Sequence, residues 1–203
     1  LIILNLNQLY VHLNHVHVYG KHIKNKFLKN NVKNIIEIKE FCPIDNYKYF
    51  TLIIKTISYC NFNCEYCCEN CNFQIKKEKI NYNDLYIFII NNYYFFTKIC
   101  KYLKISLYGG EPTLHPGLLE FCEKIYNFNR NIYLELYTNF SQDIIFFKTL
   151  LYNFNVKIIC TYHNNKLNTI KNFYQKIISI NKYYLNNISI NIMYEKKYIY
   201  DNI

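Results

Sequence analysis

The sequence predicts an α/β fold with a parallel sheet, either an open sheet or a partial α/β barrel. From about residue 50 onward, apolar segments of strand length alternate with segments of helical periodicity. This alternation gives five strands, too few for a closed eight-stranded barrel. Polar or glycine-containing segments follow the strands directly. We therefore expect βαβ units with the active site at the carboxyl ends of the strands.

The individual elements follow from local signals. The strands are short apolar runs and are expected at Leu52–Ser58, Ile105–Tyr108, Ile132–Tyr137, Val156–Thr161 and Ile188–Met193. Three helix starts are expected from local residues: a cap at Asn83 or Asp84, a first-turn proline at Pro116, and a cap at Ser141. The fourth helix is expected from the helical spacing of Ile170, Phe173, Tyr174 and Ile177. Cys100 and Cys122 occupy apolar helical positions and are expected in the core.

Two regions are predicted along the chain. Residues 1–50 form an N-terminal extension of unclear structure, in which Leu9–Val18 and Val32–Phe41 have loosely strand-like patterns. Residues 51–203 form the α/β core, and the chain could end before that core is complete.

Composition limits the classes of function. The chain has 203 residues, of which 51% are hydrophobic, as expected for a globular protein. Its net charge of +10 comes almost entirely from lysine and is interpreted as a solvated surface, so nucleic-acid binding is not favoured. No apolar run is long enough to span a bilayer, so no membrane association is expected. Nine cysteines without a recognisable signal peptide indicate a reducing compartment, the cytoplasm.

The strongest local signal is a cluster of cysteines directly after the first predicted core strand. Cys60, Cys64 and Cys67 have the spacing Cys-x3-Cys-x2-Cys. Three thiolates on one loop can bind three irons of a [4Fe–4S] cluster and leave the fourth iron open. The alternative is a zinc site built from Cys64, Cys67, Cys68 and Cys71 in a non-enzymatic interaction module. The abutting cysteine pairs leave almost no chain to wrap that metal.

A second motif closes the next predicted strand: Gly109-Gly110-Glu111-Pro112. Together, the two motifs resemble the signature of the radical S-adenosylmethionine (SAM) superfamily. The resemblance implies that Gly109, Gly110 and Glu111 contact SAM. Glycines let a backbone approach a ligand closely, and the Glu111 carboxylate can accept hydrogen bonds from the methionine ammonium.

Two weaker matches follow the next two strands. Thr138-Asn139-Phe140 is similar to the family's Thr-Asn-Gly, with Phe140 in place of the glycine. Thr161 and His163 resemble the family's polar segment after the fourth strand. The resemblance implies SAM contacts by Thr138, Asn139, Thr161 and His163, and by Tyr66, which is placed to pack on adenine.

The resemblance implies a fold, two cofactors and a reaction class. The fold is a partial parallel α/β barrel of the radical SAM type, with five to six strands. The cofactors are a [4Fe–4S] cluster and SAM, whose reductive cleavage gives a 5′-deoxyadenosyl radical that abstracts hydrogen from a substrate. That substrate, a peptide or protein, a nucleoside or a metabolite, is not identified, and no catalytic residue is assigned beyond the cluster ligands. A flavodoxin- or ferredoxin-like protein is expected as electron donor.

Overall fold

The computed structural model of the chain describes residues 4–5, 35–36, 49–67, 78–163, 169–180 and 182–192. Its main feature is a five-stranded sheet in the order β3-β4-β5-β6-β7, in which every neighbouring pair is parallel. The strands are β3 (Tyr49–Ile57), β4 (Tyr102–Gly109), β5 (Tyr133–Thr138), β6 (Lys157–Tyr162) and β7 (Ile188–Ile192). The helices are α1 (Tyr82–Ile99), α2 (Leu118–Phe128), α3 (Ile144–Phe154) and α4 (Ile170–Ile178), with 3-10 turns η3 (Pro112–Leu114) and η4 (Lys182–Asn187). Two short strands, β1 (Leu4–Asn5) and β2 (Ile35–Ile36), pair antiparallel.

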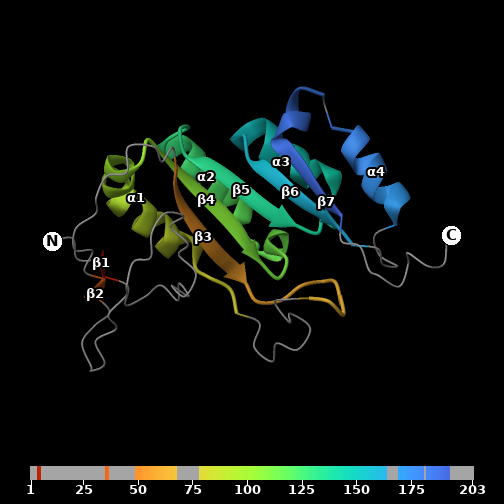
Figure 1. Ribbon diagram of the computed structural model, residues 1–203, viewed down its shortest axis with the longest axis horizontal. Helices are drawn as coiled ribbons and strands as arrows, with labels where there is room; N and C mark the ends of the chain where they lie inside the picture. The colour runs from red at the N-terminus through yellow and green to blue at the C-terminus, as the bar shows by residue number, and fades with distance from the viewer. Residues whose placement is uncertain are drawn as a thin grey trace.

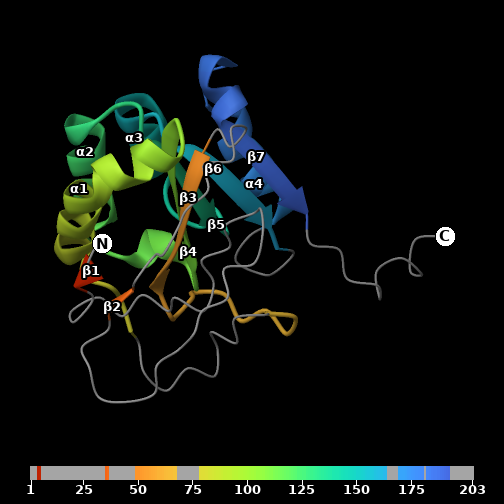
Figure 2. The same cartoon turned by 60° about the vertical axis from the view of Figure 1, so that its left-hand side comes forward.

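The strand order distinguishes between the two predicted architectures. Each strand lies beside its neighbour in sequence, so the sheet has no point at which the order reverses. A doubly wound sheet reverses its order and carries helices on both faces, whereas sequential right-handed βαβ units place all helices on one face. Figures 1 and 2 show the helices together on one side of the twisted sheet. The fold is therefore the partial α/β barrel.

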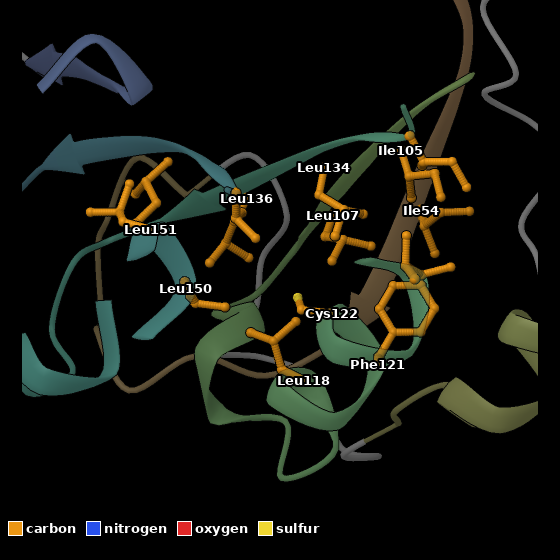
Figure 3. Close-up of a cluster of buried hydrophobic side chains, with 14 of the residues drawn as sticks. Ile54, Ile105, Leu107, Leu118, Phe121, Cys122, Leu134, Leu136, Leu150 and Leu151 are labelled. Atoms are coloured by element: carbon orange, nitrogen blue, oxygen red, sulfur yellow. The ribbon is translucent and has the colours of Figure 1, made fainter. Parts of the chain in front are cut away.

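The hydrophobic core lies between the sheet and these helices. Figure 3 shows side chains of β3, β4 and β5 meeting those of α2 and α3. Leu103, Ile105 and Leu107 alternate along β4 and are completely buried. Cys100 and Cys122 are buried as free thiols, which confirms that they are core residues.

The face of the sheet away from the helices carries polar side chains. Glu135 of β5 is buried there and forms ion pairs with Lys104 of β4 at 3.4 Å and Lys157 of β6 at 3.6 Å. The hydroxyl of Ser106 donates to the same carboxylate at 3.1 Å. The strands therefore have an apolar side and a polar side, which explains their partly alternating sequence.

Most predicted elements are confirmed, but the helix starts are shifted. Asn81 caps α1 by accepting a hydrogen bond from the Asn83 amide, and Asp143 caps α3 at 2.6 Å from the Ile145 amide. The predicted caps at Asn83 or Asp84 and at Ser141 were wrong, because a better-placed side-chain acceptor lies nearby. Pro116 precedes α2 rather than starting it.

Two of the four residues whose spacing predicted α4 are exposed: Ile170 is 68% and Tyr174 is 63% exposed, while Phe173 is buried. The strand-like segments Leu9–Val18 and Val32–Phe41 lie outside the described residues, except for the two residues of β2. No helix in the described ranges is both long and apolar enough to cross a membrane.

Candidate functional site

The cysteine loop begins where β3 ends, as predicted. Cys60, Cys64 and Cys67 are free thiols, each partly exposed. The Cys67 amide donates to the Cys64 carbonyl at 3.1 Å, which forms a turn within the loop. The Cys60 sulfur accepts a hydrogen bond from the Phe62 amide at 3.3 Å. Burial raises the pKa of the Cys60 thiol to about 11, although this hydrogen bond acts in the opposite direction.

Gly109, the last residue of β4, and Gly110 let this strand end touch the start of the cysteine loop. Gly110 donates its amide hydrogen to the Ile57 carbonyl at 2.9 Å, and Glu111 donates to the Tyr59 carbonyl at 2.9 Å. A Cβ atom on Gly110 would lie 2.0 Å from that Tyr59 oxygen. Gly109 has φ +139°, which side chains disfavour. The close approach that requires glycine is therefore between two parts of the backbone.

The Glu111 carboxylate is a buried junction between the β4 and β5 ends. Its Oε1 accepts from the Thr113 hydroxyl at 2.6 Å, the Thr113 amide at 3.1 Å and the Thr138 hydroxyl at 2.7 Å. Its Oε2 accepts from the Asn139 amide at 2.6 Å. Burial raises the pKa of this carboxyl group, while the four donors favour the anion. Because all four partners donate, we treat the carboxylate as ionised.

The segment after β5 reaches across to the cysteine loop. The Asn139 side-chain amide donates to the side-chain oxygen Oδ1 of Asn61 at 2.9 Å and approaches the Cys60 sulfur at 3.5 Å. Asn61 in turn donates to the Ser141 hydroxyl at 2.9 Å. Three side chains thus join the first cysteine to the β5 turn.

Phe140 shows how this chain tolerates the missing glycine. Its φ of 59° is left-handed, the conformation that a glycine adopts at little cost. A side chain in this region costs about 1–2 kcal/mol. The Phe140 ring is completely buried. It stacks on the Phe147 ring, with 4.1 Å between the ring centroids, and contacts the Phe173 ring edge-on, with 5.5 Å between the centroids. The free energy gained by burying an aromatic ring is large enough to offset the cost of this backbone conformation.

His163, just after β6, contacts the middle of the cysteine loop. Its Nδ1 lies 2.9 Å from the Tyr66 hydroxyl and 3.7 Å from the Cys64 sulfur. The Tyr66 ring stacks on the imidazole, and Phe62 meets it edge-on. Burial lowers the pKa of His163, so the neutral imidazole is favoured. Thr161 lies on the strand face opposite the core residues Cys160 and Tyr162.

The structure thus brings most predicted site residues to one edge of the sheet, but SAM binding by them stays a prediction. The Glu111 carboxylate and the Thr138 hydroxyl already have hydrogen-bond partners inside the protein. In the ranges that the structure describes, no three cysteine, histidine or acidic side chains converge on one metal ion. A [4Fe–4S] cluster instead binds each thiolate at a different iron, so three partly exposed free thiols on one loop fit its ligand chemistry.

Some residues of this network were not identified from the sequence. Asn61 and Ser141 join the cysteine loop to the turn after β5, and Lys176 donates to the backbone carbonyls of that turn. The asparagine lies inside the cysteine motif, but nothing in the sequence indicates its partner 80 positions away. Cys68 and Cys71 lie outside the described residues.

Comparisons with known proteins support the sequence resemblance. No family model matches the chain. A segment of 89 residues is 32% identical to the GTP 3′,8-cyclase of Helicobacter pylori and covers 42% of this chain and 26% of that enzyme. A segment of 179 residues, 72% of the chain, is 28% identical to an uncharacterized leucine-rich repeat-containing protein of Amsacta moorei entomopoxvirus, of which it covers 36%. The chain therefore spans only about a quarter to a third of these two relatives.

Solved structures show the same fold. BtrN, determined with AdoMet and 2-DOIA, has a TM-score of 0.56 at 16% identity, and the match covers 72% of this chain and 56% of BtrN. Native anSMEcpe with bound AdoMet has a TM-score of 0.51 at 24% identity, covering 70% of this chain and 42% of that protein. Both structures and the cyclase are radical SAM enzymes. The chain therefore shares the partial-barrel fold of these two structures, and it carries its three-cysteine loop and Gly-Gly-Glu-Pro turn at the carboxyl edge of that sheet.

Proposed function

We propose that this chain is a radical SAM enzyme core that binds a [4Fe–4S] cluster through Cys60, Cys64 and Cys67. The observation that carries the proposal is the direct backbone pairing of the Gly-Gly-Glu turn with the start of the cysteine loop. This pairing places a three-thiol loop and a glycine turn side by side at the carboxyl edge of a parallel sheet, where α/β proteins bind ligands. When bound, the cluster and SAM supply a 5′-deoxyadenosyl radical.

The residues of the chain have separate tasks in this proposal. The three thiolates hold the iron, and the site leaves one iron for SAM. Gly110 packs against the Tyr59 backbone, the Asn139 side chain approaches the Cys60 sulfur, and Tyr66 lies in the cysteine loop; these three would orient SAM. Glu111 holds the turns in place through its four internal hydrogen bonds.

The substrate is proposed only as a donor of a hydrogen atom. The names of the relatives point to different molecules: GTP for the Helicobacter pylori cyclase, and 2-DOIA for BtrN. Peptides or proteins, nucleosides and metabolites therefore all stay within the proposal. A flavodoxin- or ferredoxin-like electron donor and a cytoplasmic location are part of the same proposal.

Cysteine variants can separate the iron–sulfur proposal from the zinc alternative. After anaerobic reconstitution with iron and sulfide, we expect about four irons per chain. Cys60→Ala should abolish this loading, whereas the double substitution Cys68→Ala/Cys71→Ala should retain it. Cys100→Ala serves as the control because that thiol is buried at the end of α1. One tightly bound zinc that survives Cys60→Ala but not the double substitution would refute the proposal.

Enzyme turnover needs a second measurement. The reconstituted protein, reduced by dithionite in the presence of SAM, should release 5′-deoxyadenosine and methionine in equal amounts. Cluster binding without this release would reduce the proposal to a SAM-independent iron–sulfur protein.

A further inference from the structure

The turn after β5 presents three consecutive backbone carbonyls to one lysine. The ammonium of Lys176, on α4, donates to the Phe140 carbonyl at 3.0 Å, the Ser141 carbonyl at 3.2 Å and the Gln142 carbonyl at 2.8 Å. An ammonium has three N–H groups, so donors and acceptors match one to one. The same nitrogen lies 5.8 Å from the centre of the Phe140 ring.

This arrangement occurs at the one place where the chain departs from the glycine of the family motif. The left-handed Phe140 turns its carbonyl and the next two toward α4. Without a cation these carbonyls would lose their partner in a partly buried position. The lysine therefore stabilises a turn that the phenylalanine alone would disfavour.

The turn is connected to the cysteine loop through Asn139, the residue before Phe140. The Asn139 backbone amide is fixed by Glu111, and its side chain bonds Asn61 and approaches Cys60. A hydrogen bond to a cysteine sulfur is one of the means by which proteins orient and tune an iron–sulfur site.

We propose that Lys176 is a positioning residue for the cysteine loop: it fixes the Phe140–Gln142 turn and thereby holds the Asn139 amide against Asn61 and Cys60. Lys176 touches neither cysteine nor ligand and acts through the backbone. The consequence for iron binding rests on the proposed function, but the structural coupling does not.

Hydrogen–deuterium exchange on the iron-free 203-residue chain tests the coupling. Lys176→Met keeps the alkyl stem and removes the donors. We expect it to speed amide exchange on the order of tenfold, both in residues 139–142 and in residues 60–62. Lys171→Met, at an exposed position on the same helix, is the matched control and should change neither segment. Faster exchange confined to residues 139–142 would overturn the proposal.

A double substitution tests the route through Asn139. In an Asn139→Ala background, Lys176→Met should add little to exchange in residues 60–62, because both changes act through the same amide. An additive effect would overturn the proposal.

Amides of β4 report global unfolding. If they also exchange faster, Lys176→Gln, which keeps a shorter donor, replaces Lys176→Met. Faster exchange in residues 139–142 with an unchanged cysteine loop would then contradict the coupling.

Iron loss gives an independent functional readout. After reconstitution, Lys176→Met should release iron to a chelator several-fold faster than Lys171→Met, by the same loosening of the loop. Equal release rates would contradict the proposed consequence. A wild-type chain that holds no iron would refute the proposed function, whereas the exchange experiment would still decide the role of Lys176.

Discussion

The two sides of the site are fixed in different ways. The β3–β5 side comprises the loop start at Tyr59–Cys60, the Gly-Gly-Glu turn and the turn after β5. Backbone groups and a fully buried carboxylate fix these segments, and the Asn61, Asn139 and Ser141 side chains add further contacts. On the β6 side, which comprises Thr161–His163, the contacts to the cysteine loop are made by side chains. The β3–β5 side therefore depends on a particular backbone geometry. On the β6 side, single side chains can be replaced without altering the backbone.

Gly110→Ala should have the largest effect. Its Cβ would lie 2.0 Å from the Tyr59 carbonyl oxygen and 2.3 Å from the Tyr59 carbonyl carbon, and neither backbone atom can move without separating the two strand ends. We expect the free energy of unfolding to fall by about 3 kcal/mol or more. Chemical denaturation followed by circular dichroism measures it.

Gly117→Ala is the matched control for that substitution. A Cβ there would meet Tyr82 at 3.4 Å, an ordinary contact distance, so we expect a change within about 1 kcal/mol. Equal losses for the two variants would show that the close approach of β3 and β4 does not constrain the site.

Glu111→Gln should have the next largest effect on the β3–β5 side. The amide nitrogen would face groups that donate, so at least one buried donor loses its acceptor, at a cost of about 2–3 kcal/mol. Glu120→Gln, on the exposed side of α2, is the control and should cost less than about 0.5 kcal/mol. An unchanged denaturation midpoint for Glu111→Gln would show that the carboxyl group is protonated in the folded protein.

Acidification should destabilise the folded protein through His115, which follows the Gly-Gly-Glu turn. This buried imidazole accepts from the Gly117 amide at Nδ1, at 3.1 Å, and lies 2.8 Å from the Ile80 carbonyl at Nε2. Burial lowers its pKa in the folded protein. As the pH falls, His115 therefore binds a proton in the unfolded chain at a higher pH than in the folded protein. Its contribution to the free energy of unfolding is fully present above about pH 6.5 and is lost as the pH decreases through the folded pKa. The loss should be on the order of 1 kcal/mol, one hydrogen bond.

His115→Gln isolates this contribution. The difference between wild type and variant in denaturation midpoint should shrink between pH 7 and pH 5, because only the wild type gains a proton at that position. A constant difference across this range would contradict the assignment. His163 also titrates with a lowered pKa, but it is present in both proteins and cancels.

His163→Ala, on the β6 side, should have the smallest effect on stability. It removes the Tyr66 hydrogen bond and ring contacts at a half-buried position, so we expect a loss of less than about 1 kcal/mol. A loss as large as that for Glu111→Gln would show that the β6 side is as rigidly fixed as the β3–β5 side.

The sequence alone determined the order of elements and the location of the motifs. Alternating strand and helix periods predicted the parallel sheet, which the structure confirms, since these periods depend on residues near one another in the chain. The spacing of Cys60, Cys64 and Cys67 is equally local, and the [4Fe–4S] site that it indicates stays a prediction. The caps Asn81 and Asp143 were missed because several adjacent polar residues can serve, and local sequence does not rank them.

Only the tertiary structure decided what the polar atoms of the motifs touch. Apart from sequence neighbours such as Thr113, the partners of Glu111, Asn139 and Lys176 lie 27 to 79 positions away in the sequence, and no local pattern encodes such contacts. The tertiary structure also showed that Phe140 keeps the left-handed backbone expected of glycine. The Thr138–Phe140 motif can be recognised from residues adjacent in the sequence. The geometry of its turn depends on strand ends and on helix α4, which only folding brings together.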